Sequence, residues 1–227
     1  MSVTVNALRR AAFGLACLAV VSACSNAPDR QVSALSIGKS IFSGSKQPQM
    51  PSPTQIANDV AKALAATDAP LILLTVPNRK AVTVMQQLEQ NNGYKTFGTA
   101  DRRSLTMRAG MMTATRGLGN DIMSSKLGTL PQLITSRQPG TAQREMRYLD
   151  GEELTQIQVK TCTVRIEGME RLNRGHGDIS VTNVSENCRG DGGDFMNTYK
   201  VGADGQILQS RQWHSPLNKY LLIQSLR

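Results

Sequence analysis

From residue 70 onward, apolar and polar residues alternate with a period of two, which predicts β-strands that bury one face. Turn residues such as Asn91-Asn92-Gly93 separate the runs. Strands are predicted at 71–76, 80–90, 94–99, 104–115, 142–149, 154–166, 179–184, 195–201, 206–213 and 220–226. Successive strands with short polar turns predict a mainly β fold, an antiparallel meander curled into a half-open barrel.

Three segments depart from simple alternation. Apolar residues at helical spacing after Thr54, a residue suited to capping, predict a short N-terminal helix that ends before Pro70. A single helical turn is expected over 122–127. In the strand 154–166 the apolar parity shifts by one residue at Cys162, which predicts a β-bulge there.

The N-terminal segment is typical of a secretory signal. Two arginines precede an apolar run over 11–21, and Ser22-Ala23-Cys24 follows. The run is shorter than the about 20 residues of a membrane-spanning helix. The cysteine resembles that of a bacterial lipobox, which predicts acylation of Cys24; an ordinary signal cut after Ala23 is the alternative. Residues 1–23 are thus predicted to be a signal peptide. Residues 24–53 are rich in Ser, Pro and Gln and are predicted to form a flexible tether. Residues 54–227 are predicted to form one β-rich domain, anchored in the outer membrane and facing the periplasm.

Charge narrows the choice of partners. The chain has a formal net charge of +9, of which +7 remains once the two signal arginines are removed. This balance favours acidic partners such as anionic polysaccharide or lipid headgroups. Runs of Lys and Arg never exceed two residues and aromatic residues are few, so we do not expect a nucleic-acid partner.

Cysteine usage predicts one disulfide. Of the four cysteines, one lies inside the signal peptide and Cys24 is the acylation site. Cys162 and Cys188 remain as a pair in an oxidising compartment, where a disulfide is expected; two buried thiols are the alternative. Closing this loop would stabilise the fold by about 3.5 kcal/mol.

Motifs for catalysis are missing from the sequence. Two histidines, His176 and His214, without a Cys/His cluster give no zinc ligand set, and no nucleophile-elbow motif occurs. We therefore expect no catalytic residues, no metal and no cofactor. A hydrolase or lyase acting on polysaccharide is the alternative, and a cleft shared by Asp101, Asp178 and Glu186 would favour it.

Arg116, Arg211 and Trp213 are the candidate binding residues. Arg116 precedes Gly117-Leu-Gly119 and could either bind a carboxylate or cap backbone carbonyls at the barrel rim. Trp213 is the single tryptophan, and a sugar-binding ring and a core anchor are its two possible roles. Arg211 and Trp213 share one parity of their strand, which we expect to line the inner face of the curled sheet.

These stretches also carry a family resemblance. The chain resembles the YjbF/GfcB lipoproteins, which are encoded with capsule or exopolysaccharide export genes. The matching landmarks are Cys24, Leu73-Leu74-Thr-Val-Pro77, Ala114-Thr-Arg-Gly-Leu-Gly119, the pair Cys162/Cys188, Asn197-Thr-Tyr199 and Ser210-Arg-Gln-Trp213. The resemblance implies an antiparallel half-barrel and a non-enzymatic role in polysaccharide secretion, through binding of polysaccharide or of outer-membrane export proteins. It supplies no catalytic residues.

Overall fold

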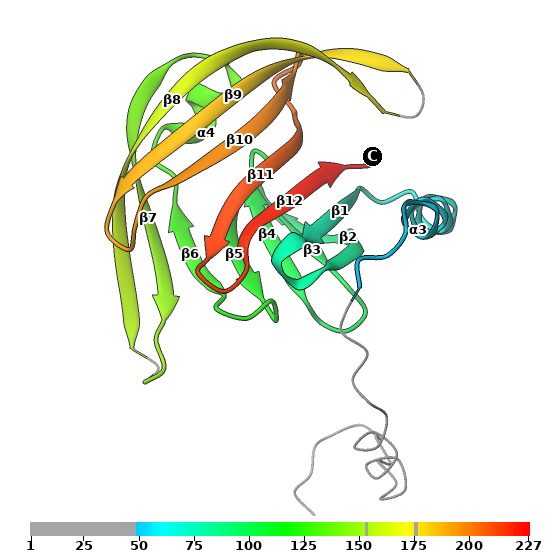
Figure 1. Cartoon of the computed structure of the whole chain (residues 1–227), viewed down its shortest axis with the longest axis horizontal. Coiled ribbons are helices and arrows are strands. Elements are labelled where there is room, and N and C mark those ends of the chain that lie inside the picture. The colour runs from blue at the N-terminus through cyan, green and yellow to red at the C-terminus, as the bar shows by residue number, and fades with distance from the viewer. Residues whose placement is uncertain (1–48, 153, 175–176) are drawn as a thin grey trace, which may run out of the picture. The chain divides into compact units, whose positions relative to one another are not determined.

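The computed structural model of this chain describes residues 49–152, 154–174 and 177–227. Twelve strands form one sheet in the order β5-β4-β3-β2-β1-β12-β11-β10-β9-β8-β7-β6, and neighbouring strands are antiparallel (Figure 1). The strands are β1 (Leu71–Val76), β2 (Ala81–Asn91), β3 (Tyr94–Gly98), β4 (Ser104–Arg108), β5 (Met111–Arg116), β6 (Ile122–Lys126), β7 (Gly140–Leu149), β8 (Thr155–Asn173), β9 (Asp178–Gly190), β10 (Phe195–Gly202), β11 (Ile207–Ser215) and β12 (Lys219–Ser225). The predicted fold class is confirmed.

The predicted signal peptide (1–23), Cys24 and the tether as far as residue 48 lie outside the described residues. Within the part of the chain that is described, no helix has the length and apolar character needed to cross a bilayer.

The sheet curls into a nearly closed barrel with one seam. The seam lies between β5 and β6, the two ends of the strand order, which follow one another in the chain and lie side by side without a shared ladder. Inward-facing apolar side chains from both halves fill the barrel, among them Leu74, Met85, Leu105, Met146, Val164 and Leu221. Alternation along the strands therefore places most of the apolar side chains inside the barrel.

Three helical segments accompany the sheet: α3 (Pro53–Ala66), the 3-10 turn η1 (Pro77–Arg79) and α4 (Leu130–Thr135). Helix α3 begins two residues earlier than predicted, because the hydroxyl of Ser52, not Thr54, accepts the backbone N–H of Gln55. Helix α4 was not predicted; its Leu130 and Ile134 are fully buried against the barrel core.

Three local predictions are wrong. The predicted helical turn over 122–127 is instead strand β6, which pairs with β7. The bulge predicted at Cys162 lies four to six residues later, between Ile166 and Gly168. The parity change misled because Ile157 and Val159, although apolar, point outward and are 50% and 43% exposed. The predicted single strand 104–115 is two strands, β4 and β5, joined through Ala109-Gly110 with positive φ at both residues.

Candidate functional site

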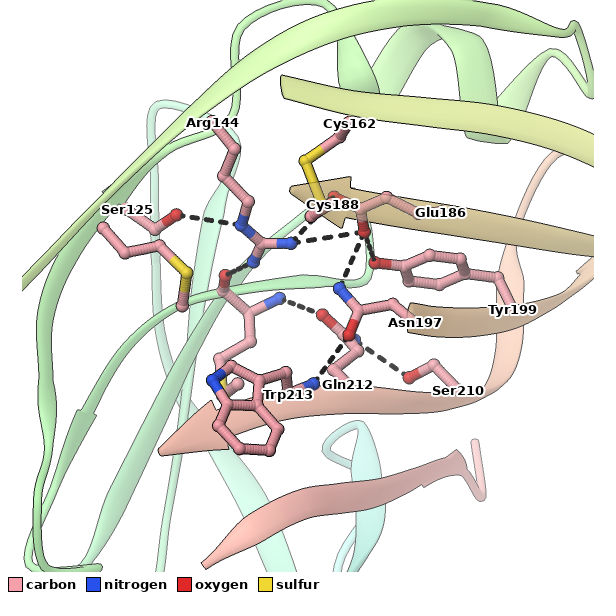
Figure 2. Close-up of polar contacts among 12 residues, drawn as sticks. Ser125, Arg144, Cys162, Glu186, Cys188, Asn197, Tyr199, Ser210, Gln212 and Trp213 are labelled. Atoms are coloured by element: carbon pink, nitrogen blue, oxygen red, sulfur yellow. Dashed lines mark hydrogen bonds and ion pairs between the residues drawn. A yellow bond between two sulfur atoms is a disulfide. The ribbon is translucent and has the colours of Figure 1, made fainter. Parts of the chain in front are cut away.

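A buried ion pair occupies the middle of the barrel. Arg144 on β7 and Glu186 on β9 both have fully buried side chains, and the guanidinium Nη1 lies 3.1 Å from Glu186 Oε1. Asn197 Nδ2 and the Tyr199 hydroxyl donate to the other carboxylate oxygen (Figure 2). Both oxygens of the buried carboxylate thus accept hydrogen bonds, as a buried charge requires.

This network supplies hydrogen bonds that the seam lacks. Met112 on the edge strand β5 donates its N–H to Gln212 Oε1 at 2.8 Å, and its carbonyl accepts from Arg144 Nη2 at 3.2 Å. Gln212 Nε2 in turn donates to the carbonyl of Gly110 and to Ser210 Oγ. Side chains from β7 and β11 therefore replace a neighbouring strand for the β5 edge (Figure 2).

The pKa shifts of Arg144 and Tyr199 keep both residues in one protonation state at physiological pH. Burial alone lowers the pKa of Arg144, but the adjacent Glu186 carboxylate and Tyr199 raise it, and the net direction is upward. Burial and the neighbouring Glu186 raise the pKa of Tyr199 well above its usual value. Arg144 is charged and Tyr199 is a neutral donor at physiological pH, which suits a structural network.

The disulfide is present between Cys162 and Cys188, which face each other across β8 and β9. Glu186 lies next to it, and ligand atoms of these three residues are within 4.8 Å of one another. Because both sulfur atoms are bonded to each other, neither is available as a thiolate ligand for a metal.

A second buried polar cluster holds the segment that contains Arg116. The Asp121 carboxylate accepts the N–H groups of Gly117 and Leu118 and the hydroxyl of Thr115. That hydroxyl is also 2.9 Å from His214 Nε2. Burial lowers the pKa of His214 to about 4, so the imidazole is neutral. The Thr-Arg-Gly-Leu-Gly stretch is therefore a fixed turn at the barrel rim.

Ser215 and His214 resemble part of a catalytic relay but lack access to substrate. His214 Nδ1 is 2.9 Å from Ser215 Oγ, and both side chains are fully buried. The acids that would favour an enzyme have separate contacts: Asp101 pairs with Arg103 at the surface, whereas Glu186 belongs to the interior network. Asp178 lies by Arg171 at the far end of the β8–β9 hairpin.

Arg116 uses its guanidinium to cap the backbone. Its Nη1 donates to the carbonyls of Thr115 and Ile122, at 2.6 and 3.3 Å. This is the second of the two roles considered for Arg116 from the sequence. The residue borders a cavity of about 610 Å³ that also includes Asp121 and Asp150. Neither Arg211 nor Trp213 lines that cavity, so the three candidate residues do not form one site.

Arg211 lies on the outer face of the sheet, not the inner face that we expected, and Trp213 is partly buried and packs against the core cluster. The β11 side chains that face inward are those of Ser210 and Gln212, which are buried in the interior network. The prediction failed because these inward residues are polar, so polarity along β11 does not mark the core side.

Arg211 and Trp213 meet through a shared tyrosine. The Trp213 ring stacks on Phe195, with centroids 6.0 Å apart, and contacts Tyr220 edge-on at 5.2 Å. The Arg211 Cζ atom lies 3.2 Å from the centroid of the Tyr220 ring. Trp213 is therefore partly a core anchor, and it supports the ring on which Arg211 rests.

The family model described as "Group 4 capsule polysaccharide lipoprotein gfcB, YjbF" matches residues 39–226. The chain belongs to the YjbF family. Membership of this lipoprotein family implies a membrane-anchored chain with a role connected to capsule polysaccharide. No curated protein matches the sequence significantly.

Among solved structures, this YjbF-family chain is similar to the crystal structure of the hypothetical lipoprotein YmcC from Escherichia coli (K12). The two share 16% sequence identity with a TM-score of 0.64, and the match covers 88% of this chain and 98% of the other. At this identity the likeness establishes the shared fold alone.

Proposed function

We propose that this protein is a non-enzymatic lipoprotein of capsule or exopolysaccharide secretion. It is anchored in the outer membrane through Cys24, faces the periplasm, and binds the polymer on the outer face of its sheet. Family membership supports the pathway. The observation that carries the binding role is Arg211, a cation in an outer groove that has no carboxylate partner among the described residues.

The groove crosses four neighbouring strands, β1, β12, β11 and β10. Its volume is about 290 Å³. Two cross-strand rows of outward-facing side chains line it. One row is Thr75, Leu222, Arg211 and Thr198; the other is Leu73, Gln224, Gln209 and Lys200. Hydroxyl and amide groups thus lie beside the guanidinium in the groove, together with the apolar side chains of Leu73 and Leu222.

This set of groups suits an acidic sugar polymer. Amide and hydroxyl side chains can donate to and accept from sugar hydroxyls. Arg211 presents a planar fork to a carboxylate, and its stacking on Tyr220 orients the guanidinium before the ligand arrives. Lys200 contributes less, because Glu170 already pairs with it.

The contacts of the acidic residues and His214 support a non-enzymatic role. Glu186 is sequestered by Arg144, and His214 and Ser215 are enclosed in the core. The alternative, a polysaccharide hydrolase or lyase, would need an accessible pair of acids, and the three acids considered from the sequence lie apart.

The test is secretion of polymer by cells that carry Arg211→Ala. Arg108→Ala is the matched control, because Arg108 also stacks on a tyrosine, Tyr94, but lies outside the groove. We expect Arg211→Ala to lower secreted polymer while the protein still folds and reaches the membrane, and Arg108→Ala to behave as wild type. Normal secretion by Arg211→Ala cells would contradict the proposal.

A further inference from the structure

One end of the barrel is plugged across only part of its width. Helix α4 contacts β7, β8 and β10 and buries Leu130 and Ile134 completely. Thr135, the last residue of α4, borders a cavity of about 430 Å³ beside the helix. The opposite side of the same barrel end, made by β1, β3, β4, β11 and β12, is therefore open.

Apolar side chains make up one wall of this cavity. They come from the inward faces of five strands: Ile72, Phe97, Met107, Ile207 and Ile223. Towards the barrel interior, Gln212 Nε2 donates to the carbonyl of Gly110 and to the hydroxyl of Ser210, and both of these residues border the cavity. The cavity is thus a pocket with one apolar wall and polar groups along its border.

The mouth carries one uncommitted cation. Lys95 is exposed at the rim, and no ion pair to it is found within the described ranges. Arg227, also at the rim, is tied to the carbonyls of Leu64 and Thr67. The Asp204 carboxylate accepts the backbone N–H of Gln206, which fixes it within its turn.

We propose that this cavity binds the acyl chain of a single-chain lipid whose anionic headgroup lies at Lys95. Its volume is within the about 300–1,000 Å³ of small-molecule pockets, and barrel mouths are frequent ligand sites. The apolar wall accepts the chain, and a rim ammonium attracts a carboxylate or phosphate. The site is on the inner face of the sheet, opposite the Arg211 groove, and does not depend on polymer binding.

The test uses membranes that contain the full acylated chain. A photoactivatable long-chain fatty acid is added to isolated membranes, so that it cannot enter lipoprotein synthesis, and cross-linked peptides are mapped by mass spectrometry. We expect cross-links in peptides from β1, β3, β4, β11 and β12. Competition with unlabelled fatty acid or with lysophosphatidic acid shows whether a carboxylate or a phosphate headgroup is preferred.

Variants define the pocket and the headgroup site. Ile223→Trp should fill the cavity and abolish the cross-links, whereas Leu88→Trp, at a side chain that is 65% exposed on β2, should leave them unchanged. Lys95→Gln should weaken competition by fatty acid about fivefold, the upper range for an exposed ion pair, without changing competition by a fatty alcohol.

Cross-links that map outside these strands would overturn the proposal. So would equal competition by acid and alcohol in the wild-type protein, a result that does not depend on any variant folding. Lys95→Gln alters an exposed side chain and should fold normally, so it still tests the headgroup site if Ile223→Trp is unstable.

Discussion

Arg144 on β7 and Arg211 on β11 point to opposite faces of the same sheet and have different partners. Arg144 is fully buried, pairs with Glu186 and binds the backbone of the edge strand β5. Arg211 rests on the Tyr220 ring, donates one hydrogen bond to the Met196 carbonyl, and has no carboxylate partner in the described ranges. The interior arginine is committed to the fold, whereas the outer one retains donors for a ligand.

The buried pair should show the largest effect when it is broken. Glu186→Gln leaves the Arg144 charge uncompensated inside the barrel, and we expect a loss of about 3–5 kcal/mol in the free energy of unfolding. Glu145→Gln is the control, because Glu145 is on the same strand as Arg144 but on its outer face, with Lys126 and Arg147. Denaturant unfolding that gave the two variants similar stabilities would contradict a structural role for the interior pair.

Removal of the disulfide next to this pair should have the second-largest effect on the free energy of unfolding. Replacing Cys162 and Cys188 together by serine opens a loop with a sequence separation of 26, and the expected loss is about 3.5 kcal/mol. Unfolding curves of the wild type under reducing and oxidising conditions provide an independent measurement. A double variant as stable as the wild type would show that the backbone ladder between β8 and β9 does not need the disulfide.

His214, in the second buried cluster, should make a smaller, pH-dependent contribution to the free energy of unfolding. Its pKa is about 4 in the fold, against a usual value near 6.5, so the folded state favours the neutral ring. Stability from this group is complete above pH 6.5 and is lost as the pH falls towards 4, by about 3 kcal/mol.

The difference between wild type and His214→Gln isolates this effect, because carboxylates present in both proteins cancel. We expect the stability difference between the two proteins to change from pH 7 to pH 4, with the wild type losing more. Parallel pH profiles would mean that His214 titrates normally.

Sequence patterns predicted the fold better than the site. Alternation and turn residues indicated most strands, since one face of each strand is buried. They failed at β6, a short strand with two serines that has weak alternation, and at the outward Ile157 and Val159.

The interior network was not predicted, because Arg and Glu side chains are seldom fully buried. The alternation along β7 and β9 nevertheless indicated the buried pair. Arg144 shares its face of β7 with Met146 and Tyr148, and Glu186 lies between Val184 and Cys188 on β9. A charged residue on an apolar parity in each of two strands indicates a buried pair. The distance between Arg116 and Arg211 depended instead on how the sheet closes, which local patterns do not encode.

The most direct test of the outer-face site is binding of an acidic exopolysaccharide to the purified full chain at low and high salt. Wild type and Arg108→Ala should bind equally, and Arg211→Ala should bind about tenfold more weakly, which corresponds to about 1.4 kcal/mol. Affinity should fall with added salt for the first two proteins and less steeply for Arg211→Ala. If Arg211→Ala binds as Arg108→Ala does at both salt concentrations, the groove is not the polymer site.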